Sequence, residues 1–201
     1  TYMIPAMGKI SAARILLIGL GKEKEFTIDR LRQASGKSAS YLSGLGLASF
    51  TTTLHLELKP LQEASQAVLE GTVLGLYRFE KYKTNNEENG KKEIREITML
   101  GNSKNEVGQV SKGAFTGKVL AEAANFAKDM VNEPSNQMTP SIMAETAKIL
   151  ANNFGLRCQV LDRDEMERLG MGSILGVAQG SNEPPRFIIL EYNGNKKEKP
   201  V

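Results

Sequence analysis

The sequence predicts an α/β fold in which at least part of the sheet is parallel. An uninterrupted apolar run at residues 12–20 is bounded by glycine, a pattern typical of a strand that is buried on both faces. Segments with helical spacing alternate with short strand-like segments along the chain. No stretch approaches the roughly 18 apolar residues that a membrane-spanning helix needs. A globular α/β protein is therefore the expected class.

Composition narrows the chemistry open to this chain. Its 26 Lys and Arg residues nearly balance 23 Asp and Glu residues, so the charge does not favour nucleic acid or an acidic membrane surface as a partner. Cys158 is the one cysteine, which excludes an internal disulfide and fits a reducing compartment, with the cytoplasm as the expected location. His55 is the one histidine. The side chains most used for transition-metal sites and for Ser/His or Cys/His catalysis are therefore nearly missing.

Capping residues mark two helices in the first half of the chain. Thr27 is suited to cap a helix that Gly44 and Gly46 end. Pro60 opens a second helical run, which reaches about Phe79.

Two strands and one loop are expected around these helices. Residues 51–58 alternate between leucine and more polar side chains, which predicts a half-exposed strand with His55 facing solvent or an adjoining helix. Residues 81–92 are polar and rich in turn formers, which indicates a flexible loop. The β-branched content of residues 93–100 favours a strand.

The second half opens with the longest helical pattern in the sequence. Ser103 and Glu106 have the spacing of a capping box, and the alanine-rich end of this helix could hold its shape between two packed bodies. Pro134 ends the helix, and Thr139 followed by Pro140 begins the next one. The remaining segments expected are a helix at 141–154, a strand at 156–161, a short helix after Asp162, an apolar glycine-rich segment at 171–180, a buried strand at 186–192 and the first step of a further strand at 200–201.

Several polar groups admit both a functional and a structural interpretation. Gly19-Leu20-Gly21-Lys22 lies where a phosphate-binding turn belongs, but the spacing matches neither a dinucleotide fingerprint nor a Walker motif, which favours a tight turn. The lone His55 is expected to be structural, because no nucleophile is marked out near it. A carboxylate cluster could suggest metal but fits capping better, and a set of loop lysines could touch phosphates but fits solvated turns better. The members of these two sets are Asp162, Asp164, Glu165 and Glu167, and Lys91, Lys92, Lys196, Lys197 and Lys199. From the residues alone, no complete active site is visible.

Three motifs together carry a family resemblance. VNEPSNQMTP at 131–140, LGMGSILGVAQGSNEPPRFIILEYNG at 169–194 and RILLIGLGKE at 14–23 resemble the leucyl aminopeptidase family of dinuclear metallopeptidases. The resemblance covers essentially the whole chain, most closely residues 120–201. It implies the later part of a macro-like N-terminal α/β domain at 1–105, a connecting helix at 106–131, and the beginning of an α/β catalytic domain at 132–201. The segment 131–140 would then join the connecting helix to the catalytic domain.

The resemblance implies a cytoplasmic aminopeptidase that removes N-terminal, leucine-type residues from peptides with two divalent metal ions, zinc or manganese. The family's metal ligands and catalytic groups would all follow Val201, so no catalytic, cofactor-binding or metal-ligating residue is assigned within the chain, which is expected to be an inactive fragment. Peptide substrates and a homo-hexamer are the implied partners, with no membrane and nucleic acid unlikely. Two alternatives stay open: a module that binds nucleic acid or an ADP-ribose-like nucleotide, and a role in oligomerisation.

Overall fold

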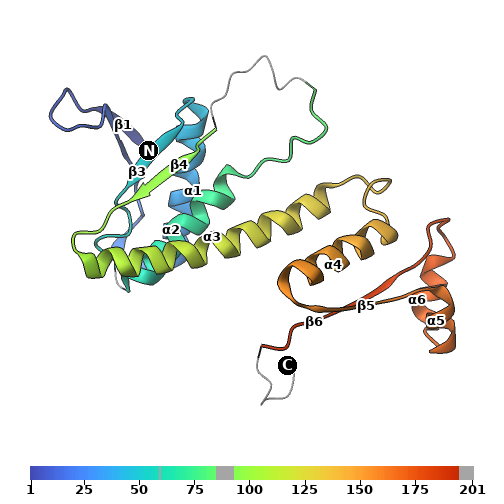
Figure 1. The fold of residues 1–201 in the computed structure, drawn as a ribbon. Coiled ribbons are helices and arrows are strands. Elements are labelled where there is room, and N and C mark those ends of the chain that lie inside the picture. The colour runs from blue at the N-terminus through green and yellow to red at the C-terminus, as the bar shows by residue number, and fades with distance from the viewer. Residues whose placement is uncertain (59, 85–92, 195–201) are drawn as a thin grey trace. The chain divides into compact units, whose positions relative to one another are not determined.

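The computed structural model describes residues 1–58, 60–84 and 93–194, in a mixed α/β fold of two compact units, 1–131 and 132–201 (Figure 1). Among these described residues, none of the helices has both the length and the apolar content needed to cross a membrane. Most of the polar loop expected at 81–92 lies outside the described residues, as does the strand expected to begin at 200–201.

The first unit contains two separate strand pairs and three long helices. Its elements are β1 (Tyr2–Pro5), β2 (Arg14–Leu17), a short 3-10 helix (Glu23–Glu25), α1 (Ile28–Gly44), β3 (Ser49–Thr52), α2 (Leu61–Leu76), β4 (Glu96–Met99) and α3 (Lys104–Asn132). β1 and β2 are antiparallel, whereas β3 and β4 are parallel with Phe50 opposite Ile97. Both pairs lie beside α1 and α2 in Figure 1.

The expectation of a buried, parallel strand at 12–20 was wrong. Only residues 14–17 form a strand, and this strand pairs antiparallel with β1. The side chains of Ile15 and Leu17 are 38% and 51% exposed. The apolar run indicated a strand that is covered on both faces. Instead, β1 and β2 form a hairpin that reverses through Met7 and Gly8, both at positive φ. Within the described residues, helices do not cover both faces of this hairpin. The turn between β1 and β2 determines that β2 pairs with β1, and the hydrophobic periodicity of residues 12–20 does not contain this information.

The strand expected at 51–58 was also misplaced. β3 occupies residues 49–52, and the chain then turns, with Leu56 N donating to Thr53 O and Leu58 N donating to His55 O. Leu54 and Leu58 pack against the hydrophobic core from within this turn. The alternating leucines are therefore directed toward the core by a turn and not by an extended strand, because a turn can also point alternate side chains inward.

The helix boundaries in the first unit agree closely with the capping residues. The Thr27 hydroxyl accepts a hydrogen bond from Arg30 N at 3.2 Å, and α1 ends at Gly44. α2 begins directly after Pro60 but ends at Leu76, about three residues before the expected limit. α3 extends over 29 residues, the longest helix in the described part of the chain.

The capping box at the start of α3 is shifted by one residue from the expected form. Ser103 Oγ accepts from Glu106 N at 3.2 Å, as the spacing predicts. The Glu106 carboxylate, however, accepts from Asn102 N at 2.9 Å instead of from the backbone of Ser103. Both bonds still satisfy amide groups at the helix start.

Helix packing in the first unit depends on very close backbone approach. Leu31 of α1 and Ala64, Ala67 and Val68 of α2 form the buried cluster between these helices. Around this cluster, glycines allow helix backbones to touch: Gly71 and Gly75 of α2 lie against α1, and Gly113 and Gly117 of α3 lie against α2. α2 is thus held on two sides by glycine contacts.

The second unit contains α4 (Pro140–Phe154), β5 (Arg157–Leu161), α5 (Arg163–Arg168), α6 (Gly172–Ala178) and β6 (Phe187–Glu191). Thr139 Oγ1 accepts from Ile142 N at 3.3 Å and so caps α4, as expected, and Gly155 ends the helix at φ 66°. The apolar segment at 171–180 forms α6. β6 pairs antiparallel with β5, but it is not buried as expected, because most of its side chains are exposed within the described residues.

Candidate functional site

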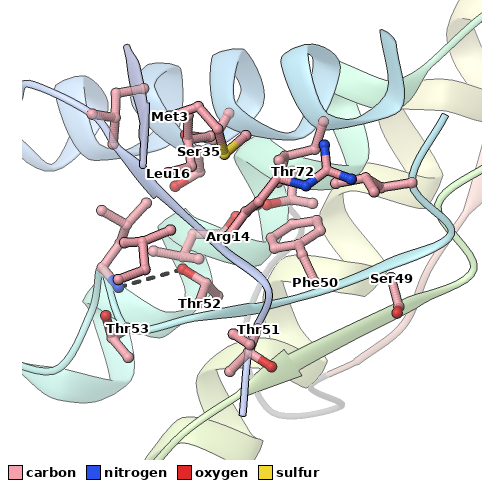
Figure 2. A pocket seen from close by; sticks show the side chains of 18 of the residues that line it. Met3, Arg14, Leu16, Ser35, Ser49, Phe50, Thr51, Thr52, Thr53 and Thr72 are labelled. Carbon is pink, nitrogen blue, oxygen red and sulfur yellow. Dashed lines mark hydrogen bonds between the residues drawn. The ribbon is translucent and has the colours of Figure 1, made fainter. Parts of the chain in front are cut away.

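The candidate site is a cavity of about 660 Å³ in the first unit (Figure 2). β2 forms one side of this cavity and β3 forms the other, while α1 and α2 supply its floor. Figure 2 shows Arg14 and Leu16 from β2 and Phe50 and Thr52 from β3 around the same space. A cavity of this size is far larger than a water molecule needs and is within the range of organic ligands or a short peptide segment.

The floor of the cavity offers few free polar groups. Ser35 Oγ donates to Leu31 O at 2.9 Å, and Thr72 Oγ1 donates to Val68 O at 2.7 Å, so both hydroxyl protons are used within their own helices. Ser38 Oγ is the exception, because it is buried without a hydrogen-bond partner in the part of the chain that the structure describes. Leu42 and Val68 complete an apolar surface.

The cavity lacks the side chains of a catalytic centre. Arg14 is the one charged residue among the described residues that line it. No carboxylate, histidine or cysteine in this lining could act as a general base or a nucleophile. The arrangement can bind an apolar or main-chain partner, and its described lining residues supply no general acid or base.

His55 does not line the cavity and is completely buried. Of its two expected environments, the first, solvent, was therefore wrong. Its Nε2 lies 2.7 Å from Leu100 O, and because a carbonyl only accepts, Nε2 must carry the proton and donate. Nδ1 has no hydrogen-bond partner among the described residues. Burial lowers the pKa of His55, against the opposing effects of the Leu100 carbonyl and the Glu106 charge. His55 thus links the turn after β3 to the segment after β4.

This burial predicts a loss of stability in mild acid. Because the folded pKa of His55 lies below its unfolded value of about 6.5, the unfolded state binds more protons as pH falls below that value. The stabilisation from neutral His55 is complete above about pH 6.5 and is lost as pH falls toward the folded pKa. We expect urea midpoints to decrease over this window, and a His55→Gln variant to show a smaller decrease. An imidazole resonance that titrates above about pH 6.5 would contradict the assignment.

The Gly19–Lys22 segment connects β2 to the short 3-10 helix and α1, without the tight turn that was expected, since the structure assigns no turn to these residues. Gly21 has φ 88°, a conformation that favours glycine. Glu25 pairs with Lys22 at 3.8 Å and with Arg30 at 3.7 Å, and the amide of Arg30 is bonded to Thr27. The cations and the helix-start amide that could hold a phosphate therefore have partners already.

The acidic cluster of the second unit functions as a helix cap. Asp162 Oδ1 accepts from Glu165 N, and the Glu165 carboxylate accepts from Asp162 N, both at 3.0 Å. Glu167 lies 3.9 Å from the Arg163 guanidinium. The five lysines singled out in the sequence, at 91, 92, 196, 197 and 199, lie outside the described residues.

A metal centre does not fit the described residues. Within 1–58, 60–84 and 93–194, no group of three or more His, Cys, Asp or Glu side chains is placed to hold a metal ion. Metal sites need several such ligands converging on one point. The sequence did not reveal the cavity. Its walls are β2 and β3, and hydrophobic periodicity predicted these strands with other bounds and, for β2, with a different pairing.

Comparison with known proteins identifies relatives along almost the entire chain. The model of the cytosol aminopeptidase family's N-terminal domain matches residues 1–86, and that of its catalytic domain matches residues 125–201. A probable cytosol aminopeptidase of Geotalea uraniireducens is 39% identical over 200 residues, which are 99% of this chain and 40% of the relative. One of Alkaliphilus oremlandii is 39% identical over 204 residues, 100% of this chain and 40% of the relative. The chain thus spans about 40% of the length of these curated relatives.

Solved structures share the same fold. The bottromycin maturation enzyme BotP in complex with Mn superposes with a TM-score of 0.79 at 29% identity, over 95% of this chain and 38% of that one. A mutant of tomato leucine aminopeptidase superposes with a TM-score of 0.70 at 22% identity, over 90% of this chain and 36% of that one, a likeness that concerns the fold alone.

Proposed function

Because this chain belongs to the cytosol aminopeptidase family, we propose that the whole protein is a metal-dependent aminopeptidase that removes N-terminal, leucine-type residues from peptides. The observation that carries the proposal is the match of two domain models of one family, in order, at residues 1–86 and 125–201. The 39% identity to probable cytosol aminopeptidases across the whole chain supports it further.

We propose that two divalent ions, manganese or zinc, serve the whole protein and that residues beyond Val201 bind them. The complex of BotP with Mn supports manganese as one candidate. Bound divalent ions of this kind activate a water molecule and polarise a carbonyl. The described residues of this chain offer no group that could hold such ions, so the proposed role of this chain is scaffolding.

The proposed scaffold has three parts. Residues 1–105 would form the later part of a macro-like N-terminal domain, 106–131 the connecting helix, and 132–201 the beginning of the catalytic domain. The proline-containing segment 131–140 supports this division, because it ends α3 and begins α4 within ten residues. We also propose a cytoplasmic location and a homo-hexamer. The location is supported by the relatives, which are named cytosol aminopeptidases.

The proposal predicts metal-dependent peptidase activity in the full-length protein. With leucine amide as substrate and Mn²⁺ added, we expect turnover that falls at least about 100-fold after chelation, because metal catalysis contributes several kcal/mol of transition-state stabilisation. Activity should return when Mn²⁺ or Zn²⁺ is restored. The separate 201-residue polypeptide is expected to show no turnover above the blank. Full activity after exhaustive chelation, or metal-dependent turnover by residues 1–201 alone, would disprove the assignment.

A further inference from the structure

One tyrosine connects the C-terminal end of α2 to the C-terminal end of α3. Tyr77 follows directly after α2, and its hydroxyl donates a hydrogen bond to Asp129 Oδ1 at 2.8 Å. Nearer the start of α3, Gly113 lies against the α2 backbone at Gln62. The contacts follow the same order along both helices, so α2 and α3 run in the same direction and are held together at two separate places.

The ring of Tyr77 makes a second contact with α3. Lys128 Nζ lies 4.8 Å from the ring centroid, which is within the range of a cation–π interaction. Lys128 Nζ also lies 3.5 Å from Asn125 Oδ1 in the preceding turn of α3. The amide of Tyr77 donates to Leu74 O at 3.3 Å, which ties the tyrosine to the last turn of α2. We call Tyr77, Lys128 and Asp129 together the Tyr77 latch.

Asp129 lies where local helix energetics disfavour it. It is in the last turn of α3, which ends at Asn132, and the partial negative charge at a helix C-terminus repels a carboxylate. No basic residue lies in this last turn to offset the repulsion. A hydrogen bond to a charged acceptor is stronger than one between neutral groups. Tyr77 therefore supplies a favourable contact that the end of the helix does not provide by itself.

The latch joins residues that belong to two different domain models. Tyr77 lies within the match to the family's N-terminal domain, whereas Lys128 and Asp129 lie within the match to its catalytic domain, which begins at residue 125 inside α3. All three residues belong to the first compact unit. Both contacts are thus complete within this chain.

We propose that the Tyr77 latch fixes the last turns of α3 to the end of α2, so that the N-terminal domain sets the direction in which the chain continues into the catalytic domain. The glycine contacts hold α3 earlier along its length, and the latch holds its last turn. Tyr77 is a positioning residue, because it acts through Lys128 and Asp129. The proposal does not depend on the proposed peptidase activity.

Amide hydrogen exchange in the full-length protein tests the latch. Tyr77→Phe removes the hydroxyl and keeps the ring, so the hydrogen bond to Asp129 is lost while the contact with Lys128 remains. We expect the amides of residues 126–131 to exchange about 10-fold faster, which is the effect of losing one hydrogen bond to a charged group. The amides of residues 110–117, which the glycine contacts hold on α2, should keep their exchange rates.

Two comparisons make this result specific. Tyr41→Phe removes the same hydroxyl from an exposed tyrosine of α1 and should leave the exchange of residues 126–131 unchanged. In an Asp129→Ala background, Tyr77→Phe should accelerate exchange there by less than about 2-fold, because the acceptor is already absent. The proposal would be overturned by unchanged exchange of residues 126–131 in Tyr77→Phe, by equal acceleration along the whole of α3, or by the same acceleration with and without Asp129.

Discussion

Replacing Gly113 with alanine is expected to destabilise the protein by about 2–3 kcal/mol. A Cβ atom at this position of α3 would lie 2.0 Å from Gln62 O and 3.0 Å from Gln66 N, both in the backbone of α2. Backbone atoms cannot rotate aside as a side chain does, so α3 must move away from α2 and leave Val110 and Ala121 less well packed. The gain of about 1 kcal/mol in helix propensity from glycine to alanine offsets only part of this loss.

The same helix provides the matched control. Gly108 lies about one and a half turns earlier in α3, and a Cβ there would meet no atom within 4 Å. Gly108→Ala should therefore keep the propensity gain without the clash and stabilise the protein by about 0.5–1 kcal/mol. Urea unfolding followed by circular dichroism measures both variants. The two substitutions should act in opposite directions: if Gly113→Ala is as stable as Gly108→Ala, the close approach of α2 and α3 is wrong.

Helices were predictable from this sequence because their signals are local. Thr27, Pro60, Ser103 and Thr139 each precede a helix by sequence rules, and each lies at the start of one in the structure. A cap satisfies amides within three residues of itself, so no distant part of the chain is needed to form it. The small error at the end of α2 has the same origin, since Gly75 lies inside the last turn and no glycine follows Leu76 to mark the end.

Strands were predicted less well because pairing is a long-range property. The apolar run around Ile15 correctly indicated a strand, but it did not reveal that β1 would be its partner. The leucines after Thr53 alternate as a strand does, yet the chain turns there. β3 and β4 are paired across more than 40 residues, and such a register depends on contacts that no local window contains.

Among the candidate functional groups, the sequence predicted correctly those that depend on helix capping or on a residue type that occurs only once. Asp162 and Glu165 form the expected cap, and the single histidine is buried in a structural contact. The glycine contacts were missed because helical periodicity counts apolar residues and treats glycine as a weakness. Two pairs with Gly-x-x-x-Gly spacing, Gly71 with Gly75 and Gly113 with Gly117, were nevertheless visible in the sequence, and this spacing puts both glycines on one helix face.

The α1–α2 contact is expected to give a graded series of destabilised variants. A Cβ would lie 2.0 Å from Arg32 O at Gly71, 2.5 Å from Gly36 Cα at Gly75, and 2.8 Å from Gly71 O at Gly36. Gly71→Ala should therefore be the most destabilising, by about 3 kcal/mol, followed by Gly75→Ala and then Gly36→Ala. Gly36 and Gly71 lie in helix interiors and gain the same propensity, so the difference between the free energies of unfolding of their variants, measured in urea, reports the clash alone.

The same series distinguishes a rigid helix pair from an adaptable one. If α1 and α2 are fixed by the buried cluster of Leu31, Ala64, Ala67 and Val68, the cost must follow the three distances, because neither helix can shift to make room. If the pair can separate, the three variants should lose similar stability, and Gly71→Ala combined with Gly36→Ala should cost little more than either alone. The ion pair of Arg32 with Glu70, at 3.2 Å across the same two helices, would lengthen in that case. Replacing Glu70 with glutamine in the Gly71→Ala background should then have no further effect, whereas a rigid pair would lose additional stability.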